Sequence, residues 1–405
     1  MLFGSKEKTI CAVEIGTTKI AVAVGLIRPG ENIRILGIGI SPSVGLRKGE
    51  IVDKIQVTEA LRDAVLKAEE NSGETIDRVF LALSGAHLHS LNRSAKLSVN
   101  GEGGLVSPKD VEALKKIAED VPLPLDRLRV VTLTKGYRID GGEMVENPVG
   151  LAGQKIEGDY IIVHGVTSRL TNIITRVTEL NIEVKNYTLS ALAASDAILN
   201  EESRQLGALV IDFGGGLTSF TLYLDGHLEA IGTIGVGGDH ITQDLAKAFN
   251  IPTRIAEELK VLHGRVFVEK SRRDEILHIK PSASFVGKKV YIDSVADVIK
   301  LRIEEVFNII KGSVGRNELS QIGAGIFLTG GTSKIAGIEL LAEYIFENRV
   351  NLVRSHDLNG AVEDLAQPAL SVVFGTLIYG KKVIEAENEQ KSIFKELKRL
   401  FYHTN

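Results

Sequence analysis

The stretch VEIGTTKIAVAVG, residues 13–25, recurs later in the chain as IDFGGGLTSFTLYLDG, residues 211–226. In each copy an apolar, β-branched run carries an acid near its end, a turn of small residues follows, and a second apolar run begins. Aligning the copies places Glu14 over Asp212. A duplicated hairpin predicts two related lobes whose equivalent turns face each other across a cleft, with chance similarity of two hairpins as the alternative.

The sequence that follows each hairpin extends the repeat. After the first copy comes the strand pattern IRILGIGI, a helical pattern from Gln56 to Glu70 that ends at Asn71 and Gly73, and the buried strand pattern VFLALS. After the second copy come HLEAIGTI and the helix-like DHITQDLAKAF. The order strand, turn, strand, strand, helix therefore occurs twice, which predicts an α/β fold of two related, duplicated lobes.

Two segments interrupt the repeat. Residues 84–164 combine a Gly-rich loop, an amphipathic helical pattern and short strands between prolines, which predicts an inserted α+β subdomain. The second segment ends in a long helical pattern from Val295 to Ile310.

The predicted boundaries are residues 1–83, 165–203 and 367–385 for the first lobe, 84–164 for the insertion, 204–249 and 323–366 for the second lobe, 250–322 for its small subdomain, and 386–405 for a linker and terminal helix.

Composition excludes several classes of protein. The 405 residues are 44% hydrophobic and 25% charged with a mean hydropathy of +0.09, values typical of a folded soluble chain. The net charge of -4 lacks the basic surplus of a nucleic-acid binder. The N-terminus has no secretory pattern and no long apolar stretch follows, so we expect a cytoplasmic location. The lone cysteine, Cys11, lies in an apolar run and is interpreted as a small core residue.

The two turns suit the binding of a polyphosphate and a metal ion. Main-chain N–H groups and hydroxyls of a Gly/Thr turn donate hydrogen bonds to phosphate oxygens, and a neighbouring carboxylate binds Mg²⁺. The acids Glu14 and Asp212 are the candidate metal ligands and the candidates for any catalytic role. The candidate phosphate-binding residues are Gly16, Thr17, Thr18 and Lys19 in the first turn and Gly214, Gly215, Gly216 and Thr218 in the second.

A third glycine turn follows the strand pattern GIFLT. Its residues Gly330, Gly331 and Thr332 would let a base or ribose approach the backbone, although an ordinary strand-to-helix turn has the same composition. Gly238 is a further candidate, with simple helix capping as its alternative. None of the three turns has the spacing of a P-loop or of a Rossmann dinucleotide motif, which argues against those enzyme classes.

Five segments in order resemble the signatures of the actin superfamily: EIGTTK, SALAASDAIL, IDFGGGLTS, FLTGGTSKIAG and ALSVVFGTLIYG. Within it the chain is most similar to the FtsA family of bacterial cell-division proteins, through the start of the insertion, the segment YRIDGGEMVENPVGLAGQKIEGDYIIVHG, and VGGDHITQDLAKAF with AEELKVLHG. The resemblance covers nearly the whole chain. It implies an actin-like, two-lobe duplicated ribonuclease-H-like α/β fold with an inserted α+β subdomain. It also implies an ATP- and Mg²⁺-binding protein that polymerises on the inner face of the cell membrane and tethers FtsZ filaments at the division site, together with other division proteins.

The same resemblance assigns further residues. It implies that Glu257 and Lys260 lie near the ribose and base, and that the helix of residues 294–311 forms part of the site for the FtsZ C-terminal tail. The alternative is that this helix is an ordinary, half-buried surface helix. The chain also departs from the family pattern at Glu14, where Asp is usual, at Leu217 and Ser219 within the usual GGGTTD, and at Ser190, where many members have Glu. These changes leave nucleotide binding in place and predict a weak ATPase at most.

The last fifteen residues reverse the charge of the chain, with four basic residues and one acid. A 3.6-residue period gathers large apolar side chains on one face and basic ones beside it, as in an interfacial membrane helix, while a helix docked on its own lobe is the alternative. The preceding EAENEQ is interpreted as a short linker without regular structure. The predicted membrane-binding residues are Ile393, Phe394, Lys395, Leu397, Lys398, Arg399, Leu400 and Phe401.

Two other functions fit parts of the sequence. A small-molecule kinase of the same superfamily needs a catalytic Asp in a substrate pocket, and no segment suggests one. A PilM-like cytoplasmic scaffold of type IV pili has a similar core and a similar insertion. It would be favoured if the terminal helix were dispensable for membrane association.

Overall fold

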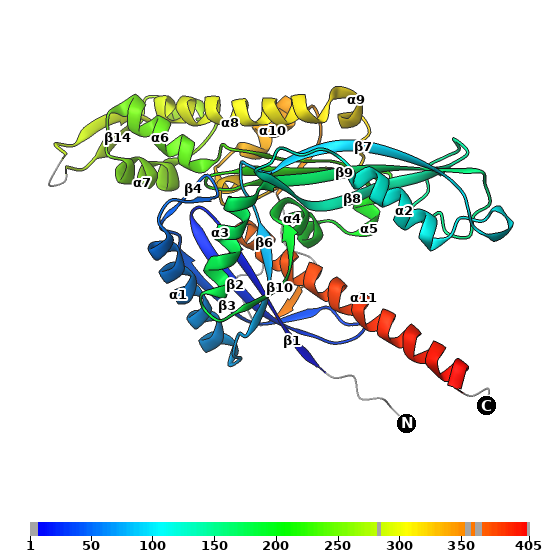
Figure 1. Cartoon of the computed structure of the whole chain (residues 1–405). Helices are drawn as coiled ribbons and strands as arrows, with labels where there is room; N and C mark the ends of the chain where they lie inside the picture. Colours follow the sequence, from blue (N-terminus) through cyan, green and yellow to red (C-terminus); the bar gives the residue numbers. More distant parts are fainter. Residues whose placement is uncertain (1–6, 282–284, 353–357, 361–366, 403–405) are drawn as a thin grey trace.

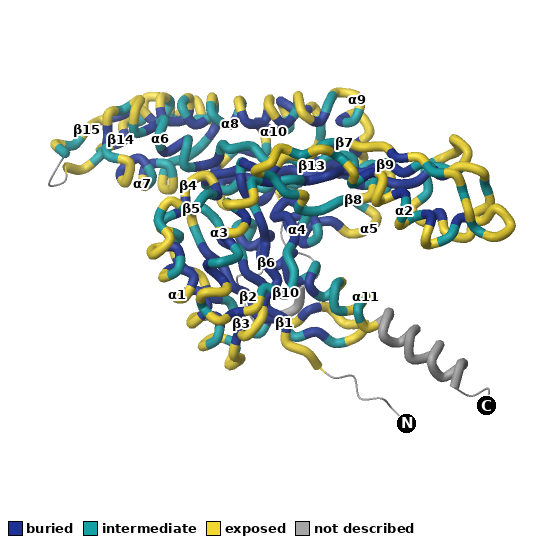
Figure 2. The backbone as a smooth tube through the Cα atoms, in the orientation of Figure 1, coloured by how far each residue is buried: buried dark blue, intermediate teal, exposed yellow. Residues whose placement is uncertain are grey.

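A computed structural model describes residues 7–281, 285–352, 358–360 and 367–402, with the backbone alone for 358–360 and 389–402. Figure 1 shows one lobe beneath an upper layer formed by the second lobe and the inserted subdomain, with the C-terminal helix projecting away from the body. Buried residues follow the strands of both lobes and of the insertion (Figure 2). The predicted two-lobe α/β fold with an inserted subdomain is confirmed.

The first lobe is built on a six-stranded sheet in the order β10-β6-β1-β2-β3-β18. Its helices cover both faces, because consecutive residues of the central strand β1 are apolar and pack alternately on the two sides: Cys11 and Val13 pack against the α1 side, and Ile10 and Ala12 pack against α11. The strands are β1 (Lys8–Ile15), β2 (Lys19–Ile27), β3 (Ile33–Pro42), β6 (Arg78–Leu83), β10 (Glu183–Leu189) and β18 (Leu358–Gly360), and the helices are α1 (Lys54–Ser72), α3 (Thr167–Thr178), α4 (Ser190–Ile198), α5 (Glu201–Gln205) and α11 (Ser371–Tyr402).

The second lobe repeats this topology, with the sheet order β13-β12-β11-β16-β17. In both lobes the first three strands form antiparallel pairs, and two later strands add in parallel on the far side of the first: β6 and β10 in the first lobe, β16 and β17 in the second. The strands are β11 (Ala208–Phe213), β12 (Thr218–Leu224), β13 (His227–Ile234), β16 (Gly325–Thr329) and β17 (Val350–Leu352), and the helices are α6 (Gly238–Phe249), α7 (Thr253–His263), α8 (Ile292–Val314), α9 (Arg316–Leu319) and α10 (Ile338–Phe346), with the small sheet β14 (Ile276–Ile279) and β15 (Lys288–Tyr291).

The inserted subdomain is a three-stranded antiparallel sheet in the order β7-β9-β8, with one helix packed on it. The helix starts at a capping box in which Ser107 and Asp110 exchange side-chain and main-chain hydrogen bonds, and its Leu114 joins Ile156 and Tyr160 in a small core. The bounds are β7 (His89–Ser98), α2 (Pro108–Glu119), β8 (Arg127–Ile139) and β9 (Lys155–Val166). The α+β insertion expected at residues 84–164 is therefore present.

A short hairpin, β4 (Leu46–Arg47) with β5 (Glu50–Ile51), reaches from the first lobe to the second. At its tip Gly49 has a φ of +73°, and a Cβ there would lie 2.8 Å from the Leu217 Cδ1 and 3.0 Å from the Gly85 Cα. Only glycine combines this backbone conformation with so close an approach. The hairpin tip is thus a direct contact between the lobes.

Two sequence expectations are corrected. The segment EAENEQ was expected to lack regular structure, but the backbone of α11 is helical through it up to Tyr402. Alanine, glutamate and glutamine are good helix formers, so the segment extends the helix that precedes it. Residues 323–366 were assigned to the second lobe, yet Leu358–Gly360 pairs in parallel with β3 and so extends the sheet of the first lobe.

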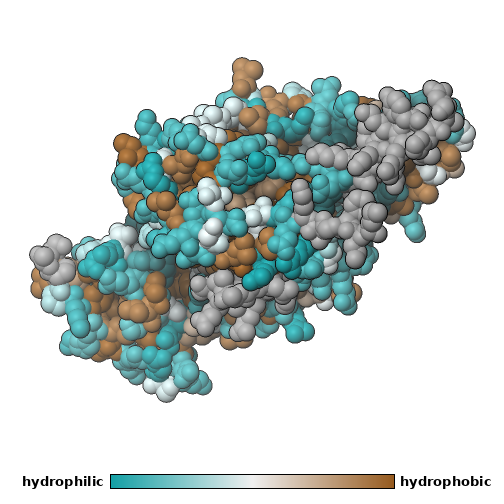
Figure 3. All heavy atoms as spheres, turned by 90° about the horizontal axis from the view of Figure 1, so that it is seen from below, coloured by the Kyte–Doolittle hydropathy of each residue, from teal (hydrophilic) through white to brown (hydrophobic). Residues whose placement is uncertain are grey.

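No helix among the described residues combines the length and apolar character needed to cross a membrane. Figure 3 shows the molecule from below, with hydrophilic and hydrophobic residues interspersed over that face. The side chains of the eight predicted membrane-binding residues, 393–401, lie outside the described residues.

Candidate functional site

The turns of the two hairpins line one cavity between the lobes. Its empty space is about 640 Å³, and its wall includes the turn that follows β16 and the start of α11. Both predicted acids line it. The lining residues are Glu14, Gly16, Thr17, Thr18, Lys19, Ser84, Ser190, Asp212, Gly214, Gly215, Gly216, Leu217, Ser219, Gly330, Gly331, Ala369 and Val372.

The two turns touch. A Cβ on Gly215 would lie 2.2 Å from the Thr18 Cγ2, and a Cβ on Gly216 would lie 2.5 Å from the Thr17 Oγ1. Any larger residue at these glycines would force the turns apart, because such contacts lie well inside van der Waals distance. The convergence of the two duplicated hairpins, expected from the sequence, is confirmed.

Free main-chain donors gather where the turns meet. The Gly16 N–H bonds to the Lys19 carbonyl at 2.9 Å and the Gly214 N–H bonds to the Leu217 carbonyl at 3.0 Å, which closes each turn. Across the described part of the chain, no protein acceptor is present for the N–H groups of the residues in between: Thr17, Thr18, Gly215 and Gly216. Successive free N–H groups in a turn form a concave donor site for an anion.

The two acids carry the charge of the cavity. Glu14 forms an ion pair with Lys19 at 2.7 Å, and both side chains are largely buried. Burial and, to a smaller extent, the charge of Glu14 raise the pKa of Asp212 to about 7, against the opposing charge of Lys19. Two carboxylates and one lysine in the same cavity leave a site that favours an added cation.

The donor set fits Mg²⁺. This ion binds through one or two carboxylates and completes its shell with water and substrate phosphates. Within the described residues no group of three or more His, Cys, Asp or Glu is arranged to hold a metal. Glu14 and Asp212 could therefore hold Mg²⁺ only as partners of phosphate oxygens, which the free N–H groups beside them are placed to bind.

A second group of predicted residues lies behind the second turn. The Thr332 hydroxyl donates to the Gly214 carbonyl at 2.9 Å, and the Gly238 N–H donates to the same carbonyl at 3.0 Å. The Lys260 ammonium binds the Gly238 carbonyl at 3.1 Å and Glu257 at 2.7 Å. None of these four residues lines the 640 Å³ cavity, but they form one network that supports its wall.

Thr218 lies outside the cavity. Its side chain is fully buried, and its hydroxyl donates to the Val236 carbonyl at 2.8 Å. A hydroxyl with a main-chain acceptor inside the lobe stabilises β12 rather than facing a ligand. The structure therefore separates Thr218 from the other predicted phosphate-binding residues.

Three serines line the cavity without having been predicted as site residues: Ser84, Ser190 and Ser219. Ser84 directly follows β6 and Ser190 begins α4 directly after β10. Because β6 and β10 are parallel to β1, their carboxyl ends meet at the same edge of the sheet as Glu14. Strand order could have identified these two positions, since ligands of open α/β sheets bind at the carboxyl ends of strands.

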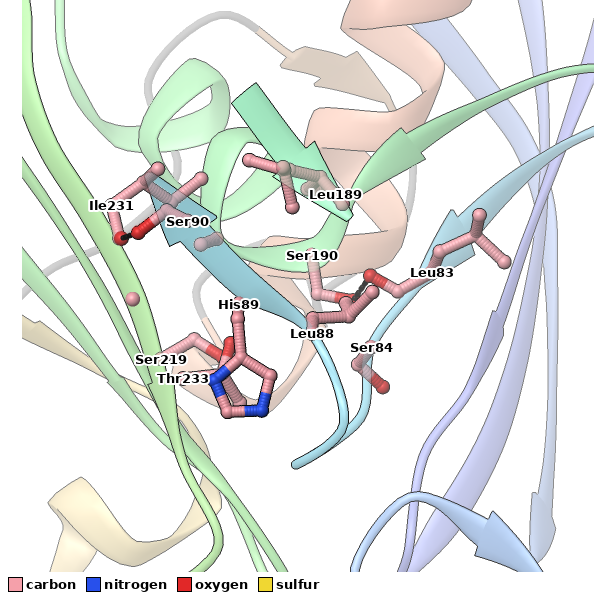
Figure 4. A pocket seen from close by; sticks show the side chains of 13 residues that line it. Leu83, Ser84, Leu88, His89, Ser90, Leu189, Ser190, Ser219, Ile231 and Thr233 are labelled. Atoms are coloured by element: carbon pink, nitrogen blue, oxygen red, sulfur yellow. Dashed lines mark hydrogen bonds between the residues drawn. The ribbon is translucent and has the colours of Figure 1, made fainter. Parts of the chain in front are cut away.

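The same three serines also line a smaller cavity of about 310 Å³, shown in Figure 4. It lies where both lobes meet the inserted subdomain, which contributes His89 and Ser90 from the start of β7. Ser90 donates to the Ile231 carbonyl at 2.8 Å, so this contact joins the insertion to the second lobe. The two cavities are therefore neighbours that share one wall.

Comparison with known proteins agrees with the fold and the insertion. The model of the family "Cell division protein FtsA" matches residues 209–375, and the model "SHS2 domain inserted in FTSA" matches residues 85–164. Cell division protein FtsA of Pseudomonas aeruginosa is 30% identical, with 92% of this chain and 89% of that protein covered. The Escherichia coli (strain K12) FtsA is also 30% identical, with 99% and 98% covered.

Solved structures show the same architecture at low identity. A PilM-PilN type IV pilus biogenesis complex superposes with a TM-score of 0.65 at 16% identity, covering 92% of this chain and 98% of that chain. MreB5 of Spiroplasma citri bound to ADP superposes with a TM-score of 0.54 at 16% identity, covering 94% and 98%. These two likenesses support the actin-like fold alone. Sequence identity over nearly the full length, together with the matched insertion, shows that the chain belongs to the FtsA family of bacterial cell-division proteins.

Proposed function

We propose that this chain is an ATP-binding, actin-like division protein that polymerises on the cytoplasmic face of the cell membrane and tethers FtsZ filaments at the septum. The proposal that the chain binds a nucleotide rests on one observation. Four free N–H groups from two touching turns line one cavity with two carboxylates. This arrangement suits a polyphosphate with its cation, and it draws half of its donors from each lobe.

In this proposal Thr17, Thr18, Gly215 and Gly216 bind the phosphates, and Lys19 balances the charge of Glu14. Glu14 and Asp212 hold Mg²⁺, which neutralises phosphate charge when bound. Gly330 and Gly331 leave room beside the cavity for the nucleoside, and the Lys260–Glu257 pair supports that side. Ligand contacts from both lobes make nucleotide binding favour the closed arrangement.

Asp212→Asn tests the metal part. The substitution removes a carboxylate that repels phosphate in the absence of metal but binds Mg²⁺ in its presence. We expect the affinity for ATP measured by calorimetry to fall at least about tenfold with Mg²⁺ and to be unchanged or tighter in EDTA. Asp225→Asn, in the exposed turn after β12, is the matched control and should change neither affinity. Equal loss in both buffers would contradict the metal role.

The membrane part of the proposal rests on the sequence of the tail and on the helical backbone of α11 through residue 402. Burial of five large apolar side chains contributes several kcal/mol, and each basic residue near anionic lipid adds about 1 kcal/mol. One helix is a modest anchor, and polymerisation would multiply it.

Sedimentation with anionic liposomes tests this part. The intact chain should pellet with the liposomes, and a chain that ends at Ala386 should stay in the supernatant. A full-length chain with Lys395, Lys398 and Arg399 replaced by Gln should pellet less with anionic liposomes than the intact chain does. Its pelleting should also depend less on the salt concentration. Equal pelleting of intact and shortened chains would contradict the tether and favour a PilM-like scaffold.

The FtsZ part of the proposal places the C-terminal tail of FtsZ on α8 and its neighbours. Leu301 of α8 is 67% exposed although most apolar residues of this helix are buried. Leu301→Ala should weaken binding of a labelled FtsZ tail peptide, measured by fluorescence anisotropy, by about five- to tenfold. Leu66→Ala, at an exposed leucine of α1 in the first lobe, should leave the affinity unchanged.

A further inference from the structure

The 310 Å³ cavity lies on the other side of the serine wall from the candidate phosphate site. Ser84, Ser190 and Ser219 line both spaces. Beyond this wall the lining includes more hydroxyls, with Ser219 and Thr233 in contact through their oxygens at 3.3 Å. A hydroxyl can both donate and accept, so this set suits water molecules next to a phosphate.

His89 is the titratable side chain that the smaller cavity adds. Among all residues that line the two cavities, the others with a titratable side chain are Glu14, Lys19 and Asp212. Glu14 and Lys19 are paired with each other, and Asp212 belongs to the proposed metal site. His89 lines the smaller cavity and is exposed, and Figure 4 shows its imidazole on the same side as Ser219 and Thr233.

Neighbouring side chains contact this imidazole and favour its uncharged form. His89 pairs with His164 across β7 and β9, and the two rings stack with centroids 6.0 Å apart. The Arg127 guanidinium of β8 donates to the His164 Nδ1 at 2.9 Å. Partial burial and the charge of Arg127 lower the pKa of His89. No carboxylate opposes this effect in the lining of the smaller cavity.

We propose that His89 positions the attacking water for hydrolysis of the terminal phosphate of the bound nucleotide, with the hydroxyls of Ser219 and Thr233 as further partners of that water. The proposal rests on the nucleotide site proposed above. The water oxygen forms a bond to the terminal phosphorus as the bond from that phosphorus to the bridging oxygen breaks. The proton released by the water passes to the imidazole and then to solvent, which leaves nucleoside diphosphate and inorganic phosphate.

Single-turnover hydrolysis of ATP by the full chain, followed as phosphate release against pH, tests this role. His89→Ala should lower the rate constant about 100-fold with ATP affinity unchanged. His89→Gln keeps a hydrogen-bonding group and should recover at least tenfold of this loss. The wild-type rate should fall as the pH drops through the range where imidazole becomes charged, and the His89→Gln rate should lack that fall.

His164→Gln is the matched control, because His164 stacks on His89 but does not line either cavity. It should retain the wild-type pH profile. Three results would overturn the inference: an unchanged rate in His89→Ala, equal loss in His89→Ala and His164→Gln, or ATP binding by the wild type without measurable turnover. Absence of ATP binding by the wild type would instead overturn the nucleotide site itself.

Discussion

Gly215 shows how single residues set the distance between the lobes. A methyl group there would meet Thr18 at 2.2 Å, whereas a methyl group on Gly331, in the same cavity wall, would meet nothing within 4 Å. We expect Gly215→Ala to lower the free energy of unfolding by about 1–3 kcal/mol through overpacking and Gly331→Ala to change it by less than about 0.5 kcal/mol. Urea denaturation of the nucleotide-free proteins measures both. Equal effects would show that the turns do not touch in solution.

His87 links stability to pH. It is 4% exposed, its Nδ1 accepts a hydrogen bond from the Val166 N–H at 3.2 Å, and burial together with Arg169 and Arg127 lowers its pKa to about 4. The unfolded chain keeps a pKa near 6.5, so below that pH the unfolded state binds more protons than the folded state. Stability is therefore complete above about pH 6.5 and should fall by about 2–3 kcal/mol on acidification to pH 4.

Urea titrations from pH 7 to pH 4 check this expectation. His87→Gln removes the titrating group, so its unfolding free energy should fall less over that range than that of the wild type. His227→Gln, at the start of β13, is the control and should follow the wild type. A wild-type and a His87→Gln curve that run parallel would contradict the assignment.

At the scale of elements, the β4–β5 hairpin acts as a contact between the lobes. Gly49→Ala should both strain a backbone at φ +73° and collide with Leu217 and Gly85. Gly30→Ala carries the same conformational cost, at φ +76°, with nothing within 4 Å of the new methyl group. Stopped-flow release of a fluorescent ATP analogue should be faster, by about tenfold, in Gly49→Ala and unchanged in Gly30→Ala. Equal release rates would show that the hairpin does not hold the lobes closed.

The elements also show what sequence could and could not predict. The duplicated hairpins predicted both sheets, because the same alternation of strand and turn occurs twice, and the insertion was predicted by its different texture. The strand Leu358–Gly360 was missed, since three residues carry no periodicity. The helical backbone through EAENEQ was missed because a polar segment without an apolar period resembles a linker. Ser84 was missed because a lone serine after a strand has no motif of its own.

At the scale of the whole molecule, both lobes and the start of the terminal helix line one site, and the insertion lines the cavity next to it. The second turn is followed by β12 and β13, and β13 contacts the insertion through Ser90–Ile231 and the Lys135–Glu229 ion pair at 2.5 Å. The far side of the same cavity is the start of α11, which leads to the tail. A ligand between the turns would therefore contact both lobes and the start of α11, while β13 connects the second lobe to the insertion.

The central claim is that both duplicated turns bind the polyphosphate of one nucleotide. A structure of the full chain with Mg²⁺ and a non-hydrolysable ATP analogue tests it most directly. The account predicts phosphate oxygens within hydrogen-bond distance of the N–H groups of Thr17 and Thr18 on one side and of Gly215 and Gly216 on the other, with Mg²⁺ beside Glu14 and Asp212. A nucleotide bound elsewhere, or phosphates held by one turn alone, would contradict it.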